Sequence, residues 1–291
     1  MRDILILVAM GAALTGCSID EMASLGNSHA YEKEFHQYYP LKSGGRISLE
    51  NYNGSVEIRG WDQERVEIDG VQYGASARLR DAIQTDVVAN GDSVRIRTIR
   101  PMEFRGSTGV KYVIKVPRRV NLDRVVTSNG SLKLDDLEGI FRVRTSNGAV
   151  RASRLRGDLD VQTSNGPVEV SDLEGPATIR TTNSGIEARI HKPEPHSPIR
   201  LSTTNGGIHL TMDALDHNDV RANTSNGGIT LKLPAQAGAR VHAQTSHNSI
   251  HSDFDVNGDN FGKNRLEGTI GGGGPTIDLT TTNGAIKLLK L

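Results

Sequence analysis

The sequence predicts an all-β fold: a single parallel β-solenoid of about nine coils of 18–22 residues, preceded by an N-terminal cap region. Three observations predict it. A Thr-Ser/Thr-Asn-Gly motif recurs along the chain, its copies are almost evenly spaced, and apolar and polar residues alternate on both sides of each copy.

The motif is tightly periodic in the middle of the chain. Its Asn falls every 18 residues at first and slightly less regularly later, and a degraded copy fills the slot at residues 245–248. The repeated asparagines are Asn129, Asn147, Asn165, Asn183, Asn205, Asn226 and Asn283. The positions four before and three after each Asn are apolar, which indicates short strands with one buried face.

Two architectures are compatible with this pattern. An Asn-Gly turn between alternating segments is typical of a β-hairpin, which would give an antiparallel meander or barrel. A solenoid places each coil on the equivalent positions of the next, so it rewards identical residues in a column. The constant coil length and the repeated columns favour the solenoid. A left-handed hexapeptide helix is disfavoured because Ser131, Ala149 and Pro167 stand where it needs an aliphatic residue.

The repeated corner is predicted to be structural. Stacked Thr and Asn side chains are expected to hydrogen-bond along the solenoid axis, as Asn ladders do in cross-β structures. Asn and Gly are expected to take the left-handed backbone conformation there. A second corner is marked by Leu137-Glu138-Gly139 and its equivalents 18 and 36 residues later.

The region before the regular repeat, residues 31–121, is predicted to be an N-terminal β region and cap continuous with the 122–291 solenoid. The interval Ala75–Gln84 reads as either a short helix or an edge strand, and residues 191–197 and 253–267 read as surface loops. Strands are predicted at Arg46–Leu49, Ser55–Arg59, Arg65–Ile68, Ser93–Thr98 and Lys111–Val116.

The first 30 residues predict export and anchoring. Residues 1–16 read as a signal peptide, because the apolar run Ile4–Leu14 is too short to span a bilayer. Leu14-Thr15-Gly16-Cys17 resembles the lipobox of bacterial lipoproteins, which implies cleavage before Cys17 and lipidation of that residue. Residues 17–30 would then form a flexible tether to the membrane. Ser18 implies sorting to the outer membrane in an organism with two membranes.

Several segments together carry a family resemblance. They are the TSNG corners, Leu49–Asp62, the strand end Ile114-Lys115-Val116-Pro117, and Gly268–Pro275 before Thr281-Thr282-Asn283-Gly284. This combination resembles the bacterial "putative adhesin" family of β-strand repeats, domain of unknown function 4097. The resemblance covers roughly residues 31–291 and implies a right-handed β-solenoid without established catalytic residues.

Composition and motifs exclude several function classes. The 34 Lys and Arg balance 34 Asp and Glu, so the chain lacks the excess positive charge that nucleic-acid binding needs. One cysteine forms no internal disulfide. No catalytic residue and no cofactor is predicted. Asp253, Asp255, Asn257 and Asp259 form a partial EF-hand spacing and are a calcium candidate, although position twelve is Asn264. His209 and His251 share a column but lie too far apart to hold one metal ion.

The sequence therefore favours a non-enzymatic, lipid-anchored module of the cell envelope that serves binding, adhesion or scaffolding. The alternative is a carbohydrate-active enzyme or a saccharide-binding module on the solenoid face, which the scarcity of aromatic residues after Tyr112 disfavours. The final strand, Ala285–Leu291, is expected to leave an open edge for a protein partner or a second copy, unless a loop covers it.

Overall fold

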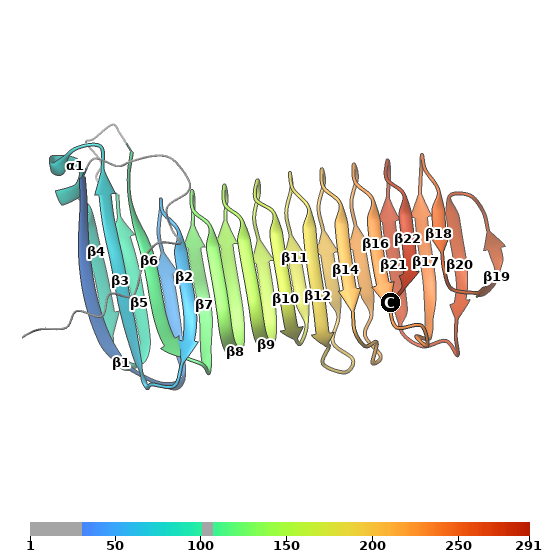
Figure 1. Cartoon of the computed structure of the whole chain (residues 1–291), viewed down its shortest axis with the longest axis horizontal. Coiled ribbons are helices and arrows are strands. Elements are labelled where there is room, and N and C mark those ends of the chain that lie inside the picture. The colour runs from blue at the N-terminus through green and yellow to red at the C-terminus, as the bar shows by residue number, and fades with distance from the viewer. Residues whose placement is uncertain (1–30, 101–106) are drawn as a thin grey trace, which may run out of the picture.

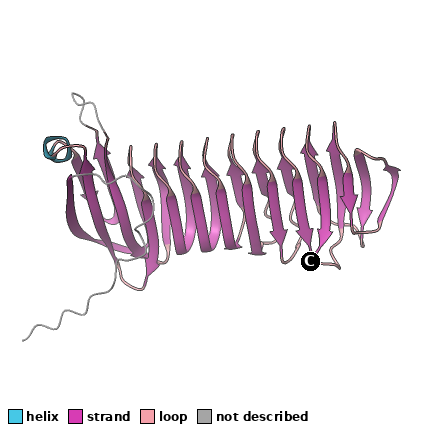
Figure 2. Cartoon of the chain, turned by 45° about the horizontal axis from the view of Figure 1, so that its top comes forward, coloured by secondary structure: helices cyan, strands magenta, loops and turns pink. Residues whose placement is uncertain are grey.

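The computed structural model describes residues 31–100 and 107–291, with the side chains of 259–261 outside the description. The described chain is an elongated stack of short strands with one short helix, α1 (Ala77–Asp81), at its N-terminal end (Figures 1 and 2). Most neighbouring strands of the repeat pair in parallel and in register, so the predicted all-β class and coil-on-coil stacking are confirmed.

Each coil contributes one strand to each of two facing sheets, which we call the groove sheet and the opposite sheet. Three long strands, β1, β8 and β9, bend at a corner and take part in both. In spatial order from the N-terminal end, the groove sheet contains β1 (Tyr31–Glu50), β3 (Arg65–Gly74), β6 (Thr108–Pro117), β2 (Val56–Trp61), β8 (Leu132–Thr145), β9 (Val150–Gln162), β10 (Val168–Glu174), β12 (Ile186–Lys192), β14 (Ile208–Met212), β16 (Ile229–Leu233), β22 (Ile286–Lys290) and β18 (Ile250–Ser252).

The opposite sheet has one strand more than the groove sheet and ends in a hairpin. Its strands in spatial order are β4 (Gln84–Ala89), β5 (Gly91–Ile99), β1, β7 (Val120–Thr127), β8, β9, β11 (Ala177–Arg180), β13 (Ile199–Ser202), β15 (Val220–Asn223), β21 (Thr276–Thr281), β17 (Ala239–Thr245), β20 (Arg265–Ile270) and β19 (Val256–Phe261).

The hydrophobic core runs along the axis between the two sheets. Every second residue of each repeat strand points inward, so columns such as Val150, Val168 and Ile186 are fully buried. Twelve strands of the groove sheet span eleven spacings of about 4.8 Å, giving a stack about 53 Å long. This length agrees with an extended rod rather than a compact globule (Figure 1).

The Thr column is buried but bonds differently from the expectation. Thr145 donates its hydroxyl hydrogen to the carbonyl oxygen of Gly130 at 3.0 Å, and Thr163 donates likewise to Gly148 at 3.2 Å. Each threonine therefore binds the backbone of the adjacent coil, not the next threonine. The column ties neighbouring coils together while satisfying its own buried hydroxyls.

The predicted left-handed conformation at the Asn-Gly corner is wrong for the ladder asparagines, none of which has a positive φ. Left-handed residues occur instead at the second corner, at Asp136, Arg154 and Asp172 with φ of 51–56°. Glycine is needed at the first corner for a different reason. A Cβ on Gly148 would lie 1.9 Å from the carbonyl oxygen of Gly130 in the next coil.

The predicted open edge at Ala285–Leu291 is also wrong. Strand β22 lies between β16 and β18, and β21 lies between β15 and β17, so the last coil of the chain occupies an interior place in the stack. The segment 253–267, expected as a loop, instead supplies β19 and the start of β20, and this hairpin covers β17 at the distal end.

The N-terminal region is similarly rearranged. The coil made by the second half of β1 and by β2 lies between the β5–β6 coil and the β7–β8 coil. All five strands predicted in this region are present, and the undecided interval Ala75–Gln84 contains α1, whose N-cap Ser76 accepts from Leu79 N. The sequence pattern did not reveal β4 or the first ten residues of β1.

Candidate binding groove

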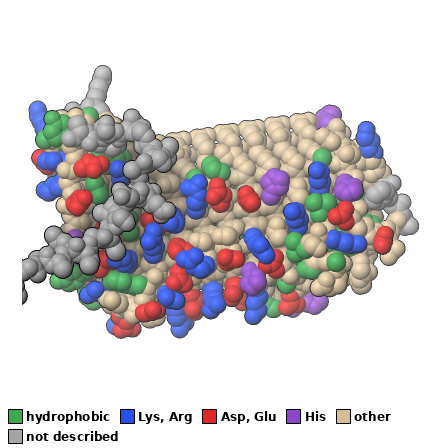
Figure 3. All heavy atoms as spheres, in the orientation of Figure 1, with side chains coloured by type: hydrophobic (Ala, Val, Ile, Leu, Met, Phe, Trp, Pro, Cys, Tyr) green, Lys and Arg blue, Asp and Glu red, His purple; other side chains and the backbone are tan. Residues whose placement is uncertain are grey.

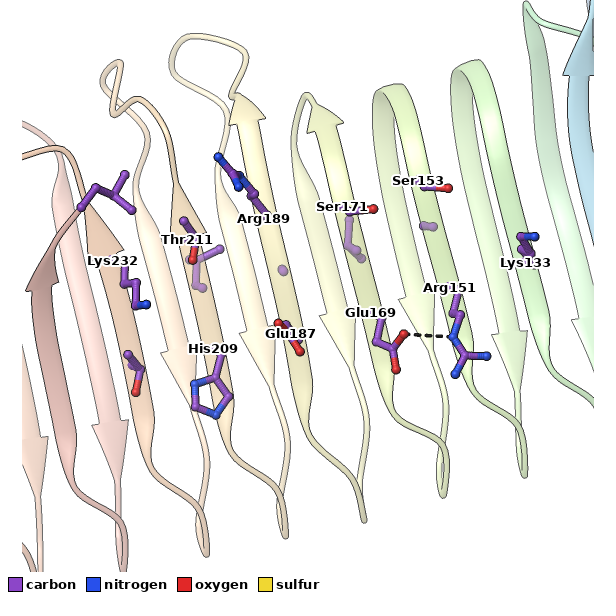
Figure 4. Close-up of a pocket in the computed structure, with 16 residues that line it drawn as sticks. Lys133, Arg151, Ser153, Glu169, Ser171, Glu187, Arg189, His209, Thr211 and Lys232 are labelled. Atoms are coloured by element: carbon purple, nitrogen blue, oxygen red, sulfur yellow. Dashed lines mark hydrogen bonds and ion pairs between the residues drawn. The ribbon is translucent and has the colours of Figure 1, made fainter.

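The groove sheet carries a shallow groove of about 890 Å³ across its middle coils. Figure 4 shows the side chains that line it, arranged in two rows across consecutive strands. One row consists of long polar or charged residues: Lys133, Arg151, Glu169, Glu187 and His209. The second row, two residues further along each strand, contains short hydroxyl side chains at Ser153, Ser171 and Thr211, with Arg189 between them.

The groove follows from residue size at two positions of the repeat. The outward residues Ser153 and Ser171 are short, so their row lies lower than the row of long side chains beside it. The inward residue before each is also modest in size, at Ala152 and Val170, which are both buried. Short residues in register over consecutive coils extend a depression along the axis instead of leaving isolated pits.

Charges along the groove are largely paired with one another. Arg151 Nε lies 2.9 Å from Glu169 Oε2, and Lys133 Nζ lies 2.9 Å from Glu57 Oε1. Burial alone would raise the pKa of the Glu57 carboxyl, but hydrogen bonds from Lys133 and Arg59 outweigh it and hold the pKa below its usual value. Glu57 is therefore a fixed anion of the groove wall.

Three ionisable side chains of the groove have no ion pair or side-chain hydrogen bond within the described part of the chain: Glu187, His209 and Lys232. They lie on consecutive strands β12, β14 and β16 toward the distal end of the groove. Their charges and donors are therefore available to a ligand.

Near them, Arg189 is held by Asp213, whose carboxylate also accepts from His191 Nδ1 at 2.8 Å. Burial raises the pKa of Asp213, but these two hydrogen bonds more than compensate and lower it overall. The arrangement fixes the guanidinium of Arg189 at the edge of the groove.

A second depression of about 750 Å³ continues the groove toward the N-terminal end. It shares Lys133 and Arg151 with the first, and its lining includes the apolar residues Val71 and Val113. The two depressions together run from β1 to β16. The shape is that of a trough for an extended chain, not of a closed pocket for a small molecule.

The Asn-Gly corner forms a different surface. In Figure 3 this upper edge of the stack is a flat strip without charged side chains over most of its length. Seven hydrogen bonds of 2.6–2.8 Å, each from one Asn Nδ2 to the Oδ1 of the preceding Asn in the stack, link Asn53, Asn129, Asn147, Asn165, Asn183, Asn205, Asn226 and Asn283.

The calcium candidate does not form an EF-hand loop. Asp253 Oδ1 lies 3.0 Å from His251 Nε2, and its Oδ2 accepts from the backbone N of Lys290 at 3.3 Å. Asn257 and Asp259 belong to strand β19, which pairs antiparallel with β20 instead of forming an EF-hand loop. Asp255 lies between these segments, and the side chain of Asp259 is outside the description.

The histidines stay apart as expected. His209 and His251 share a column, but Thr230 and Lys287 lie between them because the last coil is inserted there. One group outside the predicted sites does bring metal-type ligands together, namely His36, Glu67 and Asp69 on β1 and β3. The Lys115 ammonium lies 2.7 Å from Glu67, so a cation already neutralises that carboxylate.

The predicted lipidation site Cys17 lies outside the described residues. Within the described ranges, no helix is both long and apolar enough to cross a bilayer. The groove residues Ser153 and Ser171 were not singled out from the sequence. The signal for them was a serine at the same outward position of two neighbouring repeats.

Solved structures that match this chain at low identity come from several bacteria. A "putative cell adhesion protein" of Clostridium sporogenes is 13% identical, with a TM-score of 0.29 and coverage of 89% of this chain and 100% of that one. A "putative adhesin" of Bacteroides fragilis is 12% identical, with a TM-score of 0.34 and coverage of 89% and 97%. Another, of Parabacteroides merdae, is 9% identical, with a TM-score of 0.38 and coverage of 88% and 96%.

No curated protein matches the chain. The assignment therefore depends on the family model, which describes the Toastrack domain, DUF4097, and matches residues 45–289. Because this match spans most of the chain, from the second half of β1 to β22, the protein belongs to the Toastrack family.

Proposed function

We propose that the protein is a non-enzymatic binding module of the bacterial cell envelope, anchored through lipid on Cys17, that holds an extended ligand in the trough of the groove sheet. The observation that carries the proposal is the continuity of the trough over consecutive coils. Parallel stacking repeats the same outward positions every 4.8 Å or so, which suits a polymer that presents a contact at each step.

The chemistry of the groove supports binding rather than catalysis. The pKa values of the Glu57 and Asp213 carboxyls are both lowered, by hydrogen bonds from cationic partners that outweigh burial. A general acid needs a shift in the opposite direction. The paired charges of Arg151 and Glu169 are instead suited to orienting a ligand.

The ligand class that fits best is an extended polypeptide of mixed charge. Serine and threonine hydroxyls on the groove floor can donate and accept, and the free groups of Glu187, His209 and Lys232 offer both signs of charge. No Phe, Tyr or Trp lines the first depression, so a saccharide bound there would lack a ring to stack on. The second depression offers only the partly buried Phe35 and the buried Tyr112.

A site-directed photo-cross-linking experiment tests the proposal. A photoreactive amino acid replaces Ser171 in the groove, and a matched variant carries it at Thr178 on the opposite sheet. We expect envelope polypeptides to cross-link at position 171 and not at 178, and a further Ser153→Arg change to reduce that cross-linking about tenfold by blocking the trough. Equal cross-linking at both positions would contradict a groove ligand.

A further inference from the structure

Exposed large apolar side chains gather at the N-terminal end of the stack. Of the six in the described residues, four lie on β1, β4 and β5: Tyr31, Tyr38, Val88 and Ile99. Tyr38 is the most exposed, at 68%. The first half of β1 and β4 are also the outermost strands of their sheets at this end (Figure 1).

The core itself reaches the surface here. Phe35, Tyr39, Val87 and Ala89 pack against the buried core but remain only partly covered. They come from the same outermost strands, β1 and β4. The end of the stack therefore has an apolar centre and an apolar rim.

Cations and aromatic rings accompany these residues. The Arg65 guanidinium lies 6.0 Å from the ring centroid of Tyr38 and 5.2 Å from that of Trp61, and Lys115 Nζ lies 5.6 Å from the Trp61 ring. Strands β1, β4 and β5 carry five Lys and Arg against five Asp and Glu, and the excess of 15 against 12 over residues 31–121 comes from Lys111, Lys115, Arg118 and Arg119 on and after β6. Tyr and Trp beside basic groups are characteristic of surfaces in the headgroup region of a bilayer.

The short segment between Cys17 and the first described residue indicates which surface the N-terminal end of the stack faces. Thirteen residues separate Cys17 from Tyr31, and the fourteen residue-to-residue steps reach at most about 50 Å even when fully extended. A lipid on Cys17 would keep the N-terminal end within that distance of a bilayer, at an effective concentration in the millimolar range. Even a surface of millimolar affinity would then be substantially docked.

We infer that the N-terminal end of the stack, formed by β1, β4 and β5 with the Tyr38–Arg65–Trp61 group, docks on the headgroup region of an anionic bilayer. This inference rests on the proposed lipid anchor. Docking orients the axis away from the membrane, so the stack of about 53 Å carries the distal half of the groove well clear of the lipid.

Single-tryptophan reporters test the inference in the full-length lipidated protein. Trp61 is the only tryptophan in the sequence, so the Trp61→Phe protein has no tryptophan fluorescence of its own. Tyr38→Trp then reports on the N-terminal end, and Leu291→Trp, at a position 57% exposed, serves as the distal control. Both proteins are reconstituted into vesicles of phosphatidylethanolamine and phosphatidylglycerol at roughly 3:1, with or without spin-labelled headgroups.

Docking predicts about twofold quenching of the Tyr38→Trp emission by the labelled headgroups, with the Leu291→Trp emission nearly unchanged. Adding Val88→Asp should relieve the quenching, while the matched change Ile140→Asp, in the repeat, should not. Vesicle-bound protein whose Tyr38→Trp emission is unquenched would overturn docking and leave the anchor standing. Protein that fails to float with the vesicles would overturn the anchor, and docking with it.

Discussion

The side-chain amide of Asn165 donates from Nδ2 to Oδ1 of Asn147 over 2.7 Å, although 18 positions separate the two residues in the chain. Its own Oδ1 accepts from Asn183 at 2.6 Å. The donors all point in the same direction, so the amides form an aligned chain. At one end, Asn53 donates to the Thr108 carbonyl oxygen. Such aligned hydrogen bonds polarise one another.

Replacing Asn165 by Leu should destabilise the protein by about 1–2 kcal/mol, because two amide hydrogen bonds are lost while the backbone conformation is unaffected. The free energy of unfolding in urea measures the change. Ser164→Ala, at the exposed neighbouring position, should be nearly neutral. Equal stability of the Asn165→Leu and Ser164→Ala proteins would show that the ladder contributes little.

Gly148→Ala should cost about 2–3 kcal/mol, because the new Cβ would lie 1.9 Å from the Gly130 carbonyl oxygen and force adjacent coils apart. Gly207→Ala is the matched control. Its Cβ would lie 3.4 Å from the Gly228 oxygen, in ordinary contact. The melting temperatures of the two variants should differ by several degrees. Similar values would mean that the corner can accommodate a methyl group at Gly148 without separating the coils.

The Glu57 carboxylate should make stability fall in acid. Its pKa is lowered in the folded protein, so its contribution is fully present above the unfolded pKa of about 4.5 and is lost as the pH falls through the folded value. Lys133→Met should bring the pKa of Glu57 back toward 4.5, as measured by NMR titration. An unchanged titration in that variant would mean that Lys133 is not what holds the carboxylate ionised.

Cys17 should carry the lipid anchor, on the strength of the lipobox-like tetrad that ends at it. Metabolic labelling with palmitate should mark the wild-type protein, and the label should vanish in Cys17→Ser. The conservative change keeps the size of the side chain, so retained label in that variant would rule out this attachment site.

The sequence was most informative where a feature depends on one residue type at one repeat position. Alternation around Asn147 and Asn165 predicted the strands, their buried faces and the stacked amides. It could not predict the place of Ile286, because equivalence in a repeat does not say which coils are neighbours. Ile286 pairs with both Ile229 and Ile250, which lie 57 and 36 residues away.

The groove was harder to predict because it depends on relative size across coils. A single exposed serine such as Ser153 or Ser171 gives no sign of a binding site. The two form part of the groove floor only because they lie in register on neighbouring strands. The left-handed residues were assigned to the wrong corner because Asn and Gly tolerate that conformation intrinsically. In this fold Asp136 and Arg154 adopt it, and tertiary stacking overrides the local preference.

The inserted last coil also bears on how the protein is made. Strand β16 reaches its partner β22 across 57 residues, whereas the regular coils close after 18, and this longer loop costs about 1 kcal/mol more in chain entropy. Residues 239–252 have no native neighbour on the inner side until residues 276–290 exist. Synthesis must therefore finish before the distal third can assemble, and a prematurely truncated chain would leave two unsatisfied strand edges facing each other across a gap one coil wide.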